Sequence, residues 1–306
     1  MLAVRTTTRI DACQRIWERA IAPETVFDLW ALRECFHRHF ACPPLFLTVE
    51  ESGHSALLPL SVGSEASSAV YFPGERWRGR TWLERNRLAA SDGPSLDRLI
   101  QAAPDILDLR YLTFSSGPRI ALEEDETSYL FFPAHYDFCF DRYLASLPAK
   151  RFKSADADLD ALKAAVTYRY DAASDYARLI EMNVTTFGAD SYFHEPRFRA
   201  AFDDVVSMLR GKGWLRVTSA LIDGRPAAID VGCIYRGTHT LLAGATDSEF
   251  RGIAKLINLH HMEQACRQRL ASVDFMAGDF PWKRHFKLSP HRQYQLVTKR
   301  NARVGT

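Results

Sequence analysis

The passage from a predicted strand at 238–245 into a predicted helix from residue 253 has the composition of a diphosphate-binding turn. The first turn of a helix leaves several N–H groups unpaired and carries a partial positive charge, so it attracts anions. Gly252 would let a diphosphate approach the backbone closely, although an ordinary strand-to-helix loop can have the same residues. The candidate cofactor-binding residues are Phe250, Arg251, Gly252, Ile253, Ala254 and Lys255.

A second candidate site follows the predicted strand 273–276, where acidic, aromatic and basic side chains lie within a few residues. Binding and catalytic sites are often built at strand ends because the scaffold holds them rigidly. Asp279 could accept a proton or orient an amine, and Lys283 could bind an anionic part of a substrate. The alternative is a surface turn in which Asp279 and Lys283 pair with each other.

Several familiar catalytic patterns do not occur in the sequence. The segment His260-His261-x-Glu263 lacks the H-E-x-x-H order of a zinc pair with its base, and we expect no metal site. There is no G-x-S-x-G elbow, and no cysteine has a histidine partner in sequence, so a covalent acyl-enzyme is not expected. The block 76–82 alternates arginine with tryptophan and could stack on bases, or its tryptophans could pack inward.

The length of 306 residues is too great for one ordinary compact domain, and we expect two halves of about 150 residues. A hydrophobic share of 47% and a charged share of 25% exclude a disordered chain, a collagen and a coiled-coil rod. The net charge of +2 does not favour nucleic acid as a partner. Six dispersed cysteines and the absence of a long apolar stretch predict free thiols, no membrane span and a cytoplasmic protein.

The second half of the chain has the clearer pattern of secondary structure. Its order of helix, helix, three strands, helix, strand, loop and strand predicts a mixed α/β sheet that begins antiparallel and has one late crossover helix. This order differs from a doubly wound nucleotide-binding fold and fits an acyl-CoA N-acyltransferase fold. The predicted helices are 171–183, 196–210 and 253–270, and the predicted strands are 214–222, 226–235, 238–245, 273–276 and 291–299.

The first half opens with a helix and two strands. A turn that contains Gly53 joins the two strands, and a charged segment at 149–163 marks a plausible domain junction. The predicted helices are 23–40, 95–103 and 136–147, and the predicted strands are 45–50, 55–62 and 108–114.

The motifs near the end of the chain resemble GNAT-type acyltransferases of the CelD/BcsL-like family, which are relatives of the FemAB aminoacyl transferases. The resemblance is carried by Gly224-Arg-Pro-Ala-Ala-Ile229, by Asp247 and Gly252 before the helix, and by Asp274-Phe275-x-x-Gly278-Asp279-x-x-Trp282-Lys283. It is weaker in the first half, where it rests on Trp30, Pro59-Leu60 and Ser91-Asp92-Gly93.

This resemblance implies two tandem GNAT-like domains, a degenerate one at 1–148 and an acyltransferase domain at 149–306. It implies that the loop at Gly252 binds acyl-CoA, such as acetyl-CoA, as a co-substrate. The implied acceptor is an amine of a sugar, a peptide or a biosynthetic intermediate. The implied site residues are Asp279, Asp230 and Lys283 for catalysis, and Trp282, Asp274 and Tyr192 for substrate binding.

In the implied mechanism, a strand beside the loop polarises the thioester carbonyl while the amine attacks directly. A carboxylate takes the amine proton, and Asp279 and Asp230 are the leading candidates for this base. Asp230 interrupts an apolar strand and could instead be a charge on its solvent-facing side. Glu195 is a weaker candidate base, and Tyr192 and Tyr294 are the phenols considered.

Three departures from the family pattern leave two alternatives open. Phe250-Arg251 stands where the family usually has Ser-Pro, and Trp282 replaces a tyrosine. The bulky Phe250-Arg251 pair keeps a catalytically degenerate GNAT binding module under consideration. The acidic residues Asp156, Asp158 and Asp160 replace an arginine-rich helix, which weakens the other alternative, a FemAB-like transferase that uses aminoacyl-tRNA.

Overall fold

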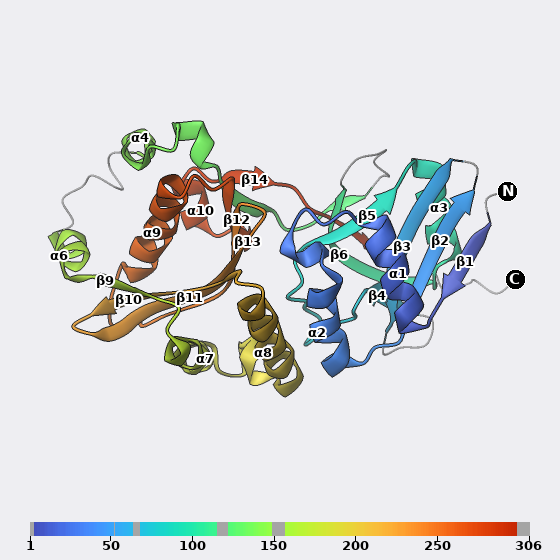
Figure 1. Cartoon of the computed structure of the whole chain (residues 1–306), viewed down its shortest axis with the longest axis horizontal. Coiled ribbons are helices and arrows are strands. Elements are labelled where there is room, and N and C mark those ends of the chain that lie inside the picture. The colour runs from blue at the N-terminus through green and yellow to red at the C-terminus, as the bar shows by residue number, and fades with distance from the viewer. Residues whose placement is uncertain (1–2, 52, 64–67, 115–121, 149–156, 299–306) are drawn as a thin grey trace, which may run out of the picture. The chain divides into compact units, whose positions relative to one another are not determined.

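The computed structural model describes residues 3–51, 53–63, 68–114, 122–148 and 157–298, which form two compact units (Figure 1). The first unit consists of Met1–Glu126, Arg197–Val205 and Arg292–Thr306, and the second of Thr127–Pro196 and Val206–His291. Each unit is therefore discontinuous in sequence. The boundary expected at 148/149 borders residues outside the described part of the chain, and we keep it as a proposal for where the second half begins.

The sheet of the second unit combines antiparallel and parallel strand pairs, which confirms the predicted mixed α/β class. Its strands follow the order β14-β8-β13-β12-β11-β10-β9, and β12 and β13 form the parallel pair. The strands are β8 (Ser128–Phe131), β9 (Thr167–Tyr170), β10 (Leu215–Ile222), β11 (Arg225–Tyr235), β12 (Thr238–Thr246), β13 (Ser272–Ala277) and β14 (Ser289–His291). The α-helices that accompany them are α4 (Phe140–Ser146), α6 (Ala157–Ala165), α7 (Ala173–Phe187), α9 (Ile253–Arg267) and α10 (Pro281–His285), with 3-10 turns at Pro133–Tyr136, Gly188–Asp190 and Tyr192–His194. Helix α8 (Pro196–Gly211) is divided, since Arg197–Val205 belongs to the first unit and the rest to the second.

Two tight turns determine the register of the meander β10-β11-β12. Asp223 and Gly224 have φ values of 50° and 76°, and Arg236 and Gly237 have φ values of 49° and 79°. Two consecutive residues with positive φ are the signature of the two-residue hairpin turns that match the twist of antiparallel strands. The turn predicted at Asp223-Gly224 is thus present.

Helices α7 and α9 cover opposite faces of this sheet (Figure 1). The hydroxyl of Ser219 on β10 donates to Asp175 on α7, at 2.6 Å. Asp230 is hydrogen-bonded to His261 on α9, and its register partner is Thr218, the neighbour of Ser219. Because successive residues of a strand point to opposite faces, Ser219 and Asp230 identify the α7 face and the α9 face.

The first unit has a second mixed sheet, with the strand order β1-β2-β3-β4-β6-β15-β7 and with β5 paired to β3 and β6. Its strands are β1 (Val4–Thr7), β2 (Pro44–Glu51), β3 (His54–Val62), β4 (Ser68–Tyr71), β5 (Asn86–Ala90), β6 (Ile106–Phe114), β7 (Glu123–Glu124) and β15 (Tyr294–Val297). Its helices are α1 (Ile10–Ala20), α2 (Trp30–Phe40) and α3 (Gly93–Ala102), with a 3-10 turn at Val26–Asp28.

The two units repeat one order of elements. In each, a strand is followed by two helices, an antiparallel group of strands, a helix, and a strand that runs parallel to the last of the group. By this order α3 corresponds to α9, and β6 corresponds to β13. Each sheet is completed by a strand from the other half of the chain, since β15 pairs with β6 and β8 pairs with β13.

The structure differs from the sequence-based expectation at several elements. Strand β1 and helix α1 lie in a segment for which the sequence patterns predict no element, and the helix expected at 23–40 is a short 3-10 turn followed by α2. Most of the charged run 149–163, and the basic residues after 298, lie outside the described residues.

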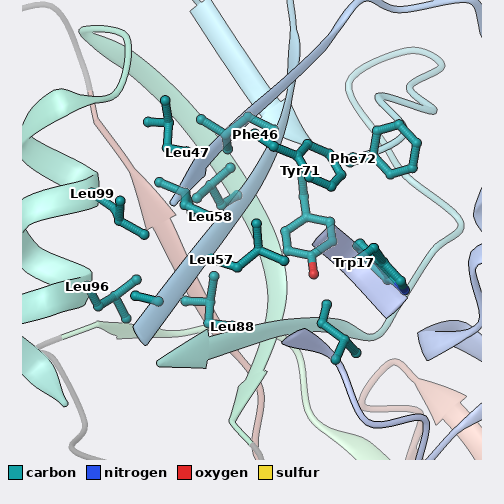
Figure 2. Packing of buried hydrophobic residues seen from close by; sticks show 14 of the residues in the cluster. Trp17, Phe46, Leu47, Leu57, Leu58, Tyr71, Phe72, Leu88, Leu96 and Leu99 are labelled. Carbon is teal, nitrogen blue, oxygen red and sulfur yellow. The ribbon is translucent and has the colours of Figure 1, made fainter. Parts of the chain in front are cut away.

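The core of the first unit is buried on both faces of its sheet (Figure 2). Phe46 on β2 packs against Trp17 of α1, with ring centroids 6.4 Å apart. Leu58 lies on the side of Leu96 and Leu99 of α3 in Figure 2. Burial on both faces explains why the segments 45–50 and 55–62 contain nearly continuous apolar runs instead of a strict alternation.

We expect Phe46→Ala to lower the free energy of unfolding by about 3–5 kcal/mol, because it opens a cavity under the rings of Trp17 and Phe72. Ile10→Ala is the matched control, since Ile10 is 37% exposed and its truncation should change stability by less than about 0.5 kcal/mol. Urea denaturation of both variants measures the difference. Equal midpoints for the two would contradict the assignment of Phe46 to the core.

Candidate functional site

Strands β12 and β13 are paired over only three residues and then part. The parallel register joins Thr238 to Ser272, His239 to Val273 and Thr240 to Asp274. Beyond Thr240, β12 continues to Thr246 without β13 as a ladder partner. Backbone N–H and C=O groups along such a gap can bind an extended ligand, because each buried group needs a partner.

The first turn of α9 begins at the end of β12, and no side chain caps it. Gly252 is the N-cap residue in the left-handed conformation, with φ 94°. The amides of Phe250, Ile253 and Lys255 donate to backbone carbonyls. Within the described residues, no hydrogen bond from the amides of Arg251, Gly252 or Ala254 is present. Gly252 and Ala254 are exposed, so these donors can receive an anion.

An arginine anchors the loop between β12 and α9. The Arg225 guanidinium donates to Asp247 at 2.7 Å and to Glu249 at 2.6 Å. The amide of Glu249 also donates to the Asp247 carboxylate at 3.0 Å. The amide bond from Glu249, followed by the contact with Arg225, lowers the pKa of Asp247. The two carboxylates of the loop are thereby paired with Arg225 beside the start of α9.

A pocket of about 610 Å³ lies between the first turns of α9 and helix α10. Its volume falls within the range of about 300–1,000 Å³ that is usual for small-molecule sites. It is lined by Gly252, Ala254, Lys255, Asn258, Trp282, His285 and Phe286. Four residues predicted from sequence are therefore brought together here, namely Gly252, Ala254, Lys255 and Trp282. Ile253 instead is buried in the core, and Phe250 packs against that core.

Asp279, after the end of β13, is held by two donors. The Tyr129 hydroxyl donates to it at 2.6 Å, and the Arg284 guanidinium donates through Nε at 2.9 Å and through a second nitrogen. The contact with Arg284, followed by that with Tyr129, lowers the pKa of Asp279. A carboxylate with a lowered pKa is a poor general base at neutral pH. The geometry supports an orienting role for Asp279, which pairs with Arg284, whereas the alternative of a surface turn paired it with Lys283.

Lys283 and Asp274 support β13 from inside the protein. Lys283 is 2% exposed and donates to the carbonyls of Met276 and Ala277, at 2.9 and 2.7 Å. Asp274 is also 2% exposed and accepts a bond from the amide of Met276. Met276 has a positive φ of 59°, so both side chains stabilise an irregular strand end. This burial revises the expectation that Lys283 and Asp274 contact a ligand directly.

Asp230 does not point to solvent, because it faces α9. Its carboxylate is 2.8 Å from Nε2 of His261, which is buried, and its side chain is 13% exposed. The rings of His261 and His239 lie 5.1 Å apart, edge to face. Burial, followed by the charge of His261, lowers the pKa of His239 well below its ordinary value. The alternative of a solvent-facing charge is therefore wrong for Asp230.

A second histidine on α9 packs between aromatic residues of β9. The ring of His260 stacks on Tyr168 with centroids 3.5 Å apart, and its Nε2 is 2.7 Å from the Tyr170 hydroxyl. Burial lowers the pKa of His260 to about 4. His260 is thus neutral in the folded protein at neutral pH.

The remaining candidates lie elsewhere in the structure. Tyr192 is half-buried in the 3-10 turn after α7, and Glu195 follows this turn. Tyr294 belongs to β15 of the first unit and packs against Phe114. Trp82 of the arginine-rich block is buried, whereas Trp77 has the guanidinium groups of Arg78 and Arg80 within about 5 Å of its ring.

The corresponding helix start in the first unit is closed by a carboxylate. Asp92 caps α3, accepting from the amide of Ser95 at 2.8 Å, and it shares a hydrogen bond with His54. These bonds, led by that with His54, lower the pKa of Asp92. An ionised carboxylate at this position would repel a phosphate, in contrast to Gly252 at the start of α9.

Several residues of this region gave no usable signal in the sequence. Arg225 belongs to the motif 224–229, but the sequence did not show that it pairs with Asp247 at the end of the neighbouring strand. Tyr129 comes from a strand inserted from the first half of the chain, and His261 belongs to a pair judged only for metal binding. The two carboxylates of the loop, Asp247 and Glu249, are the sequence feature that indicates a nearby positive charge.

Comparison with known protein families gives one match, which lies in the second half of the chain. Residues 149–284 match the family described as acetyltransferase (GNAT) domain. No curated protein matches the sequence significantly. This match covers less than half of the chain and falls mainly in the second unit, and the mixed sheets of the two units confirm the predicted α/β class with two tandem GNAT-like domains.

Solved structures share this fold at low sequence identity. A conserved protein of unknown function from Bacteroides thetaiotaomicron VPI-5482 is 12% identical, with a TM-score of 0.55 over 97% of this chain and 100% of that chain. FemX is 9% identical, with a TM-score of 0.54 over 96% and 97%. The C-terminal domain (DUF2156) of a putative lysylphosphatidylglycerol synthetase from Agrobacterium fabrum is 11% identical, with a TM-score of 0.51 over 94% of this chain and 92% of that chain.

Acidification should destabilise the wild type more than His260→Phe, which keeps the ring stack on Tyr168. The pKa of His260 is about 4 in the folded protein, against an ordinary 6.5, so the unfolded chain takes up the proton first as pH falls. Stability is therefore lost between pH 6.5 and 4, by at most about 1.4 kcal/mol per pH unit from this group. Urea denaturation over this range should show a flatter profile for His260→Phe. The exposed control His194→Phe should retain the wild-type slope, and an equally steep profile for His260→Phe would refute the assignment.

Proposed function

We propose that this GNAT-type acyltransferase takes an acyl group from acyl-CoA, such as acetyl-CoA, and transfers it to an amine of a sugar, a peptide or a biosynthetic intermediate. The observation that carries this proposal is the uncapped start of α9, with amide donors at Gly252 and Ala254, beside the gap between β12 and β13. A diphosphate and an extended arm are the parts of CoA that suit such a pair of features.

In this proposal the diphosphate binds at the start of α9. The amides of Arg251, Gly252 and Ala254 donate to its oxygens, and Lys255 adds charge from the wall of the pocket. The left-handed conformation of Gly252 keeps the approach free of a side chain. Trp282 and Asn258 line the same pocket and contact the donor or the acceptor.

The chemical step is a direct displacement at the thioester. The amine nitrogen bonds to the carbonyl carbon, the C–S bond breaks, and the thiolate leaves as CoA. Backbone N–H groups along β12 stabilise the negative charge that develops on the carbonyl oxygen. The amine proton passes to a carboxylate, for which we retain Asp230, because its side chain is partly exposed and lies beside Gly244 of the gap. Tyr192 is retained as a substrate-binding residue.

Calorimetry with acetyl-CoA, followed by mass spectrometry of reactions with a panel of amines, tests this function. Binding and a mass increase of one acyl group on an amine support it. A response to aminoacyl-tRNA without acetyl-CoA binding would favour the FemAB-like alternative. Binding without turnover on any amine would favour a degenerate binding module.

The pair Gly252→Asp and Gly252→Asn separates charge from shape at the proposed diphosphate site. Asn and Asp both tolerate the left-handed backbone of this position better than other residues. The added carboxylate of Gly252→Asp should repel the diphosphate and weaken acetyl-CoA binding at least about tenfold relative to Gly252→Asn, or about 1.4 kcal/mol. Titration calorimetry measures both constants, and equal constants would place the diphosphate elsewhere.

Asp279→Asn should lower turnover about tenfold and leave the affinity for acetyl-CoA within about threefold, because the change weakens the orientation of Tyr129 and Arg284 and not the diphosphate contacts. Thiol release during amine acylation gives the rate, and calorimetry gives the affinity. The exposed control Asp141→Asn should change neither. An unaltered rate in Asp279→Asn would remove Asp279 from the site.

A further inference from the structure

Asp230, the proposed acceptor of the amine proton, has its two carboxylate oxygens in different surroundings. Oδ2 lies 2.8 Å from Nε2 of His261 on α9, whereas Oδ1 is the oxygen that lies beside Gly244 of β12. We propose that His261 is a positioning residue, which binds Oδ2 and thereby keeps Oδ1 directed at the amine in the gap between β12 and β13. This inference rests on the proposed function, because it requires Asp230 to receive the amine proton.

Asp230 extends over the strand that borders the gap. Its register partner is Gly244, which belongs to the part of β12 beyond the pairing with β13. Residues directly opposite each other in a ladder point to the same face of the sheet, so a side chain at position 244 would share the α9 face with Asp230. Glycine leaves this place empty, and the carboxylate of Asp230 occupies it.

The distances around Gly244 show which way this carboxylate is turned. A Cβ atom at Gly244 would lie 2.3 Å from Oδ1 and 3.5 Å from Cγ of Asp230, and the next nearest atom is the Ile229 carbonyl oxygen at 3.9 Å. Oδ2 is therefore farther from Gly244 than Oδ1, and it is the oxygen that His261 binds. The Asp230 side chain is 13% exposed, which leaves it accessible to a small group such as an amine or a water molecule.

The imidazole of His261 is fixed by its surroundings. Its side chain is 2% exposed, and His239 of β12 packs edge to face against it with ring centroids 5.1 Å apart. Gly232 makes room for His239, since a Cβ atom there would lie 2.9 Å from Nε2 of that ring. The terminal torsion of an aspartate is broad, so a carboxylate without a fixed partner adopts many orientations. The bond with the buried His261 removes this freedom from Asp230.

The direction of this bond follows from the charge of the carboxylate. An ionised carboxylate only accepts hydrogen bonds, so Nε2 of His261 carries the hydrogen and donates it to Oδ2. As the amine nitrogen bonds to the thioester carbonyl carbon, its proton passes to Oδ1, the C–S bond breaks and the thiolate leaves as CoA. A base must lie within hydrogen-bond reach of the proton, directly or through one water. Loss of His261 should therefore lower turnover, while the diphosphate contacts at the start of α9 stay intact.

The test separates the hydrogen bond of His261 from its packing. His261→Gln keeps an N–H donor at about the reach of Nε2, whereas His261→Met fills a similar space without a donor. Thiol release from acetyl-CoA, with water or a panel amine as acceptor, gives kcat, and calorimetry gives the affinity for acetyl-CoA. His261→Met should lower kcat on the order of 10- to 100-fold and leave the affinity within about threefold. His261→Gln should stay within about fivefold of the wild type in both quantities.

A double variant shows whether His261 acts through Asp230. Asp230→Asn should itself lower kcat, and the addition of His261→Met should lower it less than about twofold further, because the two residues form one unit. His194→Met replaces an exposed histidine and is the matched control, with kcat and affinity unchanged.

A second readout requires no variant of His261. In the ¹⁵N–¹H spectrum of histidine-labelled protein, the Nε2–H resonance of His261 should shift between the wild type and Asp230→Asn, because the acceptor changes from a carboxylate to an amide. An unshifted resonance, unchanged turnover in His261→Met, or an equal loss of kcat in His261→Gln and His261→Met overturns the proposal for His261. Failure of the wild type to bind acetyl-CoA overturns the proposed function itself, so the two failures are distinguishable.

Discussion

The parting of β12 from β13 after Thr240 is the constraint on which the rest of the second unit depends. Main-chain donors and acceptors need partners, and a sheet that separates its strands exposes two rows of them. The protein holds the separated edges with side chains. Lys283 binds the carbonyls at the end of β13, and Asn183 binds the carbonyl of Gly244 on β12. Side-chain hydrogen bonds therefore stabilise the two separated strand edges.

After β12 separates from β13, the chain continues through a loop to the start of α9. The loop after Thr246 turns through Gly252 in a left-handed conformation, and Arg225 pairs with both carboxylates of this loop, which offsets one of their two negative charges. A positive helix terminus without a capping side chain thus lies beside the gap. The proposed acyl-CoA site combines these two elements, one for the diphosphate and one for the extended arm.

The two units show how one fold can have different helix starts. Both have the same order of strands and helices, but the helix after the meander is capped by Asp92 in the first unit and begins at Gly252 in the second. A carboxylate occupies the position that would otherwise attract an anion. Function therefore depends on single residues placed on the fold, not on the fold alone.

Local interactions explain what could be predicted from the sequence. The strands of the meander could be predicted from the alternation of apolar and polar residues. The turn at Asp223-Gly224 could be predicted because two adjacent residues determine its backbone conformation. Gly252 and Trp282 were found because a helix start and a strand end are local features, and both line one pocket. The first helix was not predicted although its sequence carries a local signal, since the buried Cys13 and Trp17 are four residues apart and so lie on one helical face.

The sequence did not predict that β8 and β15 each join the sheet formed by the other half of the chain. It also did not predict which groups the charged residues bind. Both depend on contacts between positions far apart in the chain. Asp279 binds Tyr129 across 150 residues, and Asn183 reaches Gly244 across 61. Periodicity shows that Asp230 interrupts an apolar strand, but not which helix covers that face. Short-range sequence patterns determine the helices and strands. The packing of these elements determines which polar groups contact each other, because a buried polar group must find a hydrogen-bond partner among its few neighbours.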